Sequence, residues 1–312
     1  METYLIMASY NIPFSHIARK CLQAILLIFL VVLLSLSLGI VEDGLYYRDK
    51  DTFENNFAHD LGFKYYSYYA YLAMGFVQCL IYRWRKKMNL PKIILLLVIS
   101  YVMFILSSTR LQMYSCMAFI GFCIILPFVP KFIFNNKLSG FLSLILYPGI
   151  CVVLYYVSKY SILSLFLYNF DEINRMTSGR LRLNEEAFVY YDANLWGNKM
   201  EFDTEIGTNT YFYVDSGYLH TLLESGIVYT ALIMLLYSVL FYKVYKAKAY
   251  FLYIWLGLYS LICISNGLLT SLLANPILLL AFSSVEVISH DYELGSYKRT
   301  VKKSKPLLAP SI

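Results

Sequence analysis

The residues best suited to chemistry lie in one polar stretch, residues 159–215, which separates two apolar parts of the chain. The stretch holds three arginines and nine carboxylates, and its second half is rich in aromatic residues and glycine. Long loops in compact domains are usually functional, because binding and catalytic residues concentrate on loops that a rigid scaffold positions. We therefore take this stretch as the candidate binding or active-site loop.

Two of its arginines, Arg180 and Arg182, fall in the first turn of a predicted helix. The segment TSGRLRLNEEAFVYY has helical character, and Thr177 or Ser178 is suited to be its N-cap. Arg182 lies about 200° round the helix from Arg180. At 3.6 residues per turn, one face of this helix is formed by Arg180, Asn184, Ala187 and Tyr191.

Cations are poorly placed at a helix start, where the helix dipole favours anions by about 0.3–1 kcal/mol. The placement of Arg180 and Arg182 is explained if an anion binds there, since free backbone N–H groups and guanidinium forks together suit a phosphate or diphosphate. Alternatively, the two arginines pair with carboxylates of their own loop, namely Asp171, Glu185 and Glu186. The sequence leaves both interpretations open.

Asp215 and His220 follow at the start of the next apolar segment and are candidate general bases. They are five residues apart, so a helix would not stack them, and they need not act as a pair. A histidine at this place can also be a residue of the membrane interface. We find neither a Gly-rich phosphate loop nor a GxSxG motif, so nucleotide-driven chemistry is not expected.

A further arginine, Arg110, lies in the turn LSSTRLQMYS between two apolar segments. A charge at or just within a membrane face is costly, which makes it a candidate functional residue. The alternative is that its apolar stem lets the guanidinium reach the interface.

The composition indicates a membrane protein. The 312 residues are 59% hydrophobic and only 15% charged, against about 25% charged in ordinary soluble domains. The net charge of +6 comes from short clusters beside apolar segments, which is typical of membrane topology rather than of nucleic-acid binding. The six cysteines lie in apolar segments without CxxC or Cys/His spacing, so we expect packing residues, no metal site and no cofactor.

We predict an all-α, polytopic membrane protein with about eight transmembrane helices and one large external loop. Each span needs about 20 apolar residues, and the eight segments are 22–41, 66–82, 91–107, 111–130, 138–158, 219–242, 249–266 and 270–288. Lys and Arg mark the cytoplasmic side, which places residues 42–65 and 159–215 outside. Residues 1–21 are predicted to be a cytoplasmic lead-in that is interfacial or disordered, and 289–312 a basic cytoplasmic tail. The tyrosines that flank the spans are read as an interfacial belt, with sugar stacking as the alternative.

Four stretches give the chain a resemblance to a known family. It resembles the O-antigen and capsular repeat-unit polymerases of bacteria, the Wzy-type membrane glycosyltransferases, which are related to the O-antigen ligases. The matching stretches are LGFKYYSYYAYL, ILSSTRLQMYS, TSGRLRLNEEAF with LWGNK, and VDSGYLHTLLESGIVYTALIMLLY. They are similar to the family's Gly-Phe loop, its Ser/Thr-Arg turn, its Ser-Gly-Arg helix with a following "plus Gly" turn, and its Gly-Tyr-Leu span, in the same order.

The resemblance implies a multi-pass protein of the bacterial cytoplasmic membrane whose substrate is an undecaprenyl-diphosphate-linked oligosaccharide. Arg110, Arg180 and Arg182 would bind the diphosphate, and Asp215 or His220 would deprotonate the acceptor hydroxyl. No metal or nucleotide is implied; membrane lipid, a flippase and a chain-length regulator are the implied partners. The chain departs from the family at Asp215, where many members have a catalytic histidine.

Two other functions stay open. A flippase or polysaccharide exporter would be expected to show ionisable residues in mid-span and repeated halves, neither of which is evident. A ligase of the O-antigen type fits the sequence as well as a polymerase does.

Overall fold

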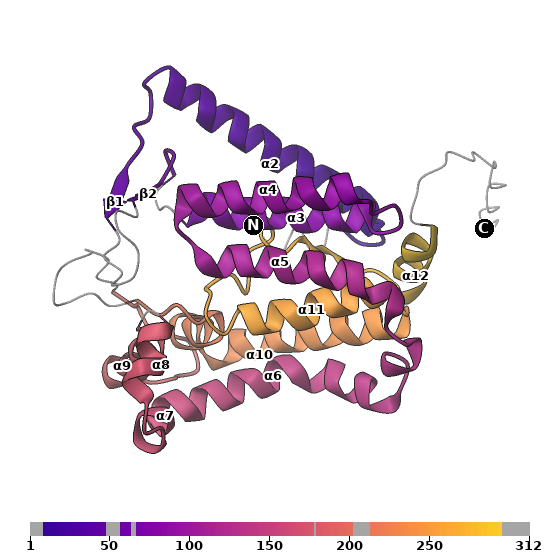
Figure 1. The fold of residues 1–312 in the computed structure, drawn as a ribbon. Helices are drawn as coiled ribbons and strands as arrows, with labels where there is room; N and C mark the ends of the chain where they lie inside the picture. The colour runs from indigo at the N-terminus through magenta and orange to yellow at the C-terminus, as the bar shows by residue number, and fades with distance from the viewer. Residues whose placement is uncertain (1–8, 48–56, 64–66, 178, 202–212, 295–312) are drawn as a thin grey trace, which may run out of the picture.

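The computed structural model describes residues 9–47, 57–63, 67–177, 179–201 and 213–294 of the chain. Its long helices lie side by side in a bundle (Figure 1). They are α2 (Phe14–Ser37), α3 (Tyr68–Trp84), α4 (Leu90–Ser107), α5 (Arg110–Ile125), α6 (Lys137–Lys159), α10 (Gly217–Lys246) and α11 (Tyr250–Ile262). The shorter elements are β1 (Leu45–Tyr47), β2 (Phe57–His59), η1 (Leu126–Phe128), η2 (Lys131–Ile133), α7 (Ile162–Phe166), α8 (Phe170–Met176), α9 (Arg180–Tyr190), η3 (Pro276–Leu280) and α12 (Val285–Leu294).

The two ends of the bundle differ in what they carry. At one end, on the left of Figure 1, lie the antiparallel hairpin β1–β2 and the helices α7, α8 and α9, and we call it the loop end. At the other end lie α12 and the turns that join α3 to α4 and α10 to α11, and we call it the basic end. Its turns contain Arg85, Lys86, Lys87 and Lys248, and Lys246 ends α10 beside them.

The helices present apolar side chains on their outer faces. Among the described residues, five helices are long and apolar enough to cross a membrane: α2, α4, α5 continued by η1, α6 and α10. On α4 alone, Ile94, Val98, Tyr101 and Ile105 are each more than half exposed. Apolar surface of this extent is rare on a water-soluble monomer. The chain is therefore a multi-pass helical membrane protein, which confirms the predicted fold class.

The predicted span 270–288 is not a continuous helix. It contains turns, η3 and the first residues of α12. The sequence pair Asn275-Pro276 explains the break, because a residue before proline avoids the α conformation and proline has no N–H to donate. Buried tyrosines supply partners for the irregular backbone that leads into it: Tyr259 donates to the Leu268 carbonyl at 2.6 Å. Non-helical backbone at membrane depth is tolerated where protein surrounds it in this way.

The first helix begins earlier than predicted. Residues 14–21 belong to α2, and Phe14, Ile17 and Ala18 are buried in the bundle, so this part of the predicted lead-in is structured. Pro13 is the N-cap residue of the helix, a place where its missing N–H costs nothing. The backbone N–H of Ser15 donates to Asp291 of α12 at 2.9 Å, and this carboxylate suits the positive end of the helix dipole. Residues 1–8 and the predicted tail from 295 onward lie outside the described residues.

The arrangement fixes which loops share a side of the membrane. Reporter fusions after Lys87 and Lys246, both at the basic end, are expected to report the cytoplasm, together with one after Lys137. A fusion after Lys199, near the loop end, is expected to report the outside, because Lys and Arg are retained on the cytoplasmic side. The measurement is paired alkaline phosphatase and fluorescent-protein activity. A cytoplasmic signal after Lys199 would contradict the orientation.

Candidate active site at the loop end

The helix that carries the two arginines starts at Arg180. Its N-cap residue is Gly179, with a φ of 81° that favours glycine, rather than the predicted Thr177 or Ser178; Ser178 itself lies outside the described residues. Asn174 takes over the capping, since its carbonyl accepts from Gly179 N–H at 2.8 Å and its side-chain Oδ1 from Arg182 N–H at 3.1 Å. The first turn thus holds both arginines, as predicted, but one of its N–H groups is already bound.

One face of α9 docks onto the bundle. Ala187 is fully buried against Val214, Leu219 and Leu223, and Asn184 on the same face is 5% exposed. This is the face that the helical period predicts from Arg180 to Tyr191. Because Val214 immediately precedes Asp215, the docking brings the start of α9 to the start of α10.

Arg180 and Asp215 form an ion pair at this junction. Nε of Arg180 donates to Oδ2 of Asp215 at 3.0 Å, and the two side chains are 26% and 23% exposed. The pair is thus neither fully desolvated nor a solvated surface contact, so a charge-assisted hydrogen bond strengthens it beyond a neutral one. Nε carries the bond, and no other hydrogen bond joins the Arg180 side chain to a described residue. As far as the described residues go, its two terminal nitrogens can bind a second anion.

Aromatic and polar groups surround the ion pair. Tyr71 of α3 is half-buried within electrostatic range of both Asp215 and Arg180. The sequence analysis missed Tyr71, because it stands in a run of tyrosines that was read as an interfacial belt. The Tyr213 hydroxyl and the Asp215 carbonyl lie near Gly267, where an added Cβ would be in ordinary van der Waals contact with both, at 3.9 and 4.0 Å.

Several buried polar atoms near the ion pair have no hydrogen-bond partner among the described residues. They are Oδ1 of Asn184, Oγ of Ser216 and the side-chain amide of Asn266. Ser216 follows Asp215 directly. Asn266 packs against Gly217, since a Cβ added to Gly217 would lie 2.7 Å from the Asn266 carbonyl oxygen. Such atoms are uncommon in folded proteins and call for an explanation. A buried water is the ordinary partner of such atoms, and a polar ligand that replaced it would make the same bonds.

The second predicted diphosphate arginine, Arg182, points elsewhere. Its Nη2 donates to Oδ1 of Asp171 at 2.6 Å, its side chain is 53% exposed, and its guanidinium lies 5.8 Å from the Phe170 ring centre. It borders an open hollow of about 470 Å³ together with residues of the α7–α8 region. Arg182 therefore pairs with Asp171, as in the alternative that the sequence left open, whereas Arg180 pairs with Asp215, the last residue of the loop.

His220 and Arg110 complete the predicted set. Nδ1 of His220 lies 3.3 Å from Oε2 of Glu224, one turn along α10, and the ring is 6.2 Å from that of Tyr213. Arg110 is the first residue of α5 and is half-buried. Since α5 starts at the loop end (Figure 1), Arg110 shares this end of the bundle with Arg180.

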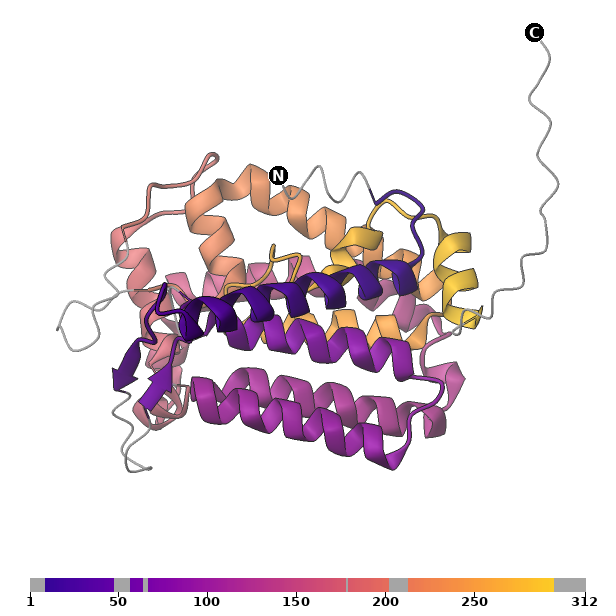
Figure 2. The ribbon, with the colours of Figure 1, turned by 90° about the horizontal axis from the view of Figure 1, so that it is seen from above.

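A break in α10 ties the loop to the bundle. Gly226 interrupts the helix with a φ of 87° and a ψ of 171°. The turn around Gly197 fills the gap: Ile227 N–H donates to the Asn194 carbonyl at 2.9 Å, and Asn198 N–H donates to the Leu223 carbonyl at 2.8 Å. The contact leaves no room for side chains, because a Cβ on Gly197 would lie 2.0 Å from the Glu224 carbonyl, and one on Gly226 would lie 2.4 Å from the Gly197 nitrogen. Figure 2 shows the bent course of α10.

Comparison with known proteins adds no relative. No family model matches the chain, no curated protein matches it, and no solved structure matches it. The class established here is that of a multi-pass helical membrane protein with a charged site at one end.

The two close-packed glycines can be tested by substitution. Gly197→Ala and Gly226→Ala are each expected to destabilise the protein by about 1–3 kcal/mol or more, because the added methyl group meets backbone and both glycines have a positive φ. The measurement is the melting temperature in detergent. Gly121→Ala and Gly149→Ala are matched controls, since an added Cβ meets nothing within 4 Å there; helix propensity favours alanine by roughly 0.5–1 kcal/mol. Wild-type melting of Gly197→Ala would contradict the docking.

Proposed function

We propose that this chain is a membrane glycosyltransferase that polymerises undecaprenyl-diphosphate-linked oligosaccharide units on the outer leaflet of a bacterial cytoplasmic membrane, in the manner of the Wzy-type polymerases that its sequence resembles. The product would be an O-antigen, a capsule or an exopolysaccharide. The observation that carries the proposal is the Arg180–Asp215 ion pair at the loop end of a membrane bundle. It joins an anion-binding group and a candidate base at the level where the diphosphate of a lipid substrate would lie.

The ion pair supplies the two functions that this transfer needs. The acceptor hydroxyl attacks the anomeric carbon of the donor glycan, the bond from that carbon to the diphosphate oxygen breaks, and the diphosphate leaves with the bonding electrons. The hydroxyl proton goes to the carboxylate of Asp215, which acts as general base. Arg180 stabilises the charge that develops on the diphosphate oxygen. The leaving group is already activated, so no nucleotide takes part.

The geometry favours Asp215 over His220 as the base. Asp215 accepts a hydrogen bond from Arg180 at 3.0 Å, so a diphosphate that binds Arg180 lies next to Asp215. The diphosphate then competes with Asp215 for the guanidinium and weakens the bond between the two side chains. His220 is instead engaged with Glu224.

Purified protein is expected to convert the lipid-linked oligosaccharide into longer chains and to release one undecaprenyl diphosphate for each new glycosidic bond. The assay follows both products in detergent or proteoliposomes, with a chelator present and without nucleotide. A flippase or exporter is the second candidate, favoured by the broken helix α10 and the irregular segment after α11, which are frequent in transporters. Movement of the lipid-linked glycan without release of diphosphate would contradict the polymerase.

The same assay separates Arg180 from the other arginines. Arg180→Lys is expected to lose nearly as much activity as Arg180→Ala, because lysine keeps the charge but not the planar fork; the loss should correspond to about 1.5–3 kcal/mol of transition-state stabilisation. Arg175→Ala is the matched control, an exposed arginine of α8 in the same loop, and should be close to wild type. Full activity of a folded Arg180→Ala variant would mean that this arginine is only a structural partner of Asp215.

A further inference from the structure

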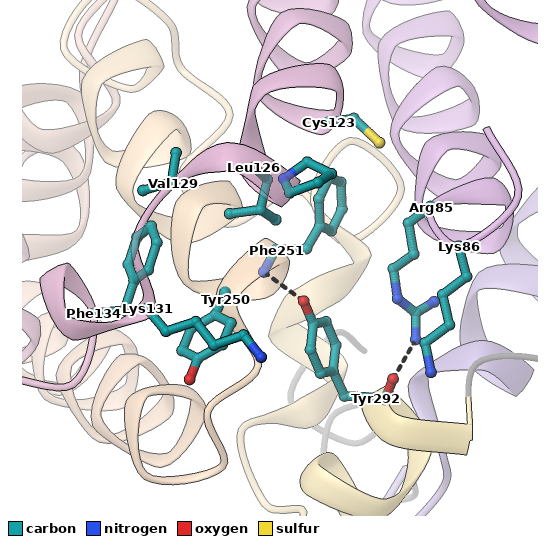
Figure 3. Close-up of a pocket in the computed structure, with 11 residues that line it drawn as sticks. Arg85, Lys86, Cys123, Leu126, Val129, Lys131, Phe134, Tyr250, Phe251 and Tyr292 are labelled. Atoms are coloured by element: carbon teal, nitrogen blue, oxygen red, sulfur yellow. Dashed lines mark hydrogen bonds between the residues drawn. The ribbon is translucent and has the colours of Figure 1, made fainter. Parts of the chain in front are cut away.

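A second cavity lies at the basic end, at the opposite end of the bundle from the candidate active site (Figure 3). Its volume is about 220 Å³. It forms where the turn after α3, the connection η1–η2, the start of α11 and the helix α12 meet. Its walls are basic, aromatic and apolar: Arg85, Lys86, Cys123, Leu126, Pro127, Val129, Lys131, Phe134, Tyr250, Phe251 and Tyr292.

Among the residues that the structure describes, three cations and no acidic side chain line the cavity. In the view of Figure 3, Lys131 lies on one side of the Tyr292 ring, with Arg85 and Lys86 on the other. Asp291 stands next to Tyr292 in the sequence, but its carboxylate is bound away from the cavity, to the Ser15 backbone and, at 2.9 Å, to a tyrosine hydroxyl of α3. The described lining residues with ionisable side chains at this cavity are therefore basic except for the cysteine and the tyrosines.

Among the described residues, neutral groups hold the guanidinium of Arg85. Nη1 donates to the Tyr82 carbonyl at 2.6 Å, Nη2 donates to the Tyr292 carbonyl at 3.1 Å, and Cζ lies 3.8 Å from the centre of the Tyr82 ring. Its Nε is buried and has no hydrogen-bond partner among the described residues. A guanidinium that is fixed by carbonyls and aromatic rings keeps its full charge and has a donor to spare.

The surroundings of the cavity belong at a membrane surface. The connection η1–η2 that forms one wall exposes Phe128 by 82% and Phe132 by 71%, beside the lysine that lines the cavity, Lys131. Aromatic side chains next to cations at helix ends are typical of the headgroup region of a bilayer. The turns and the end of α10 add further basic residues here, Lys87, Lys246 and Lys248, which marks the cytoplasmic leaflet by the positive-inside rule.

We propose that this cavity binds the phosphate headgroup of an anionic membrane lipid from the cytoplasmic leaflet. Basic pockets between membrane helices on this side are suited to anionic headgroups. A volume of about 220 Å³ corresponds to roughly seven waters at about 30 Å³ each, which fits a phosphodiester and a small polar group. The acyl chains lie outside the cavity, along the exposed apolar residues of η1 and α5. A free phosphate ion would satisfy the cations but would leave Phe128 and Phe132 uncovered.

The bound headgroup stabilises the position of α12. This helix is joined to the cavity by the Tyr292 hydroxyl, which accepts from Phe251 N–H at 3.2 Å, and by the Tyr292 carbonyl, which accepts from Arg85. A ligand that bridges Arg85, Lys86 and Lys131 holds α3, η2 and α12 together. Because it binds the folded protein alone, it raises the melting temperature with its concentration.

The experiment measures the melting temperature of the full chain in a neutral detergent. Phosphatidylglycerol is titrated in one arm, phosphatidylcholine in a second and inorganic phosphate, at matched concentrations, in a third. Only phosphatidylglycerol is expected to raise the melting temperature. The double variant Lys86→Gln/Lys131→Gln is expected to bind phosphatidylglycerol about 25-fold more weakly, at roughly fivefold for each lysine near an anionic headgroup.

The control variant is Lys137→Gln, an exposed lysine at the start of α6 that does not line the cavity, and it should bind like the wild type. If the double variant melts below the wild type without lipid, Lys131→Gln alone decides, with an expected fivefold loss. Equal affinity of the wild type and the lysine variants for phosphatidylglycerol would overturn the proposal, since the lipid would then be bound by the overall charge of the protein surface and not by the cavity. An equal effect of inorganic phosphate would overturn it as well, in favour of a soluble anion.

Discussion

A backbone N–H or C=O group that lacks a partner in or near the hydrocarbon region costs several kcal/mol, and the arrangement of the loop end follows from how α10 meets this constraint. Gly226 breaks the helix, so amides and carbonyls around the break lose their helical partners. The turn at Gly197 replaces them, with Asn198 donating to the Leu223 carbonyl and Ile227 donating to the Asn194 carbonyl. The stretch beyond the break, from Ile227 to Lys246, is still about 30 Å long at roughly 1.5 Å per residue and can cross the bilayer alone.

This docking places the candidate site. Once the Gly197 turn is seated in the break, the chain between α9 and that turn is short, and α9 lies against the first part of α10 through Ala187. Arg180 at one end of α9 then reaches Asp215 at the start of α10. Within the described residues, apolar packing and backbone hydrogen bonds thus hold the charged pair in place. In the proposed reaction such preorganisation is what lets a fixed arginine stabilise developing charge.

The sequence predicted what depends on local pattern. The lengths of the apolar segments predicted the helices of the bundle. The helical period of 3.6 residues predicted the face of α9 that is buried, with Asn184 and Ala187. It could not give contacts that join distant segments: the fit of Gly197 against Gly226, or the pairing of Arg180 with a carboxylate that follows it by 35 residues. The irregular segment around Asn275 could not be recognised from its composition. Its side chains are as apolar as those of a membrane-spanning helix, and buried tyrosines supply hydrogen bonds to the non-helical backbone that leads into it. Tyr71 could not be singled out either, because it stands in a run of tyrosines.

The most direct measurement is amide hydrogen exchange at Asn198, followed residue by residue by NMR in the reconstituted protein. Asn198 lies outside any helix or strand, so only its bond to the Leu223 carbonyl, at 2.8 Å, can slow its exchange. We expect strong protection of Asn198 relative to Lys199 in the wild type, and loss of that protection in Gly197→Val, which cannot seat the turn. Exchange of Asn198 at the rate of Lys199 in the wild-type protein would contradict the docked loop and, with it, the placement of Arg180 beside Asp215.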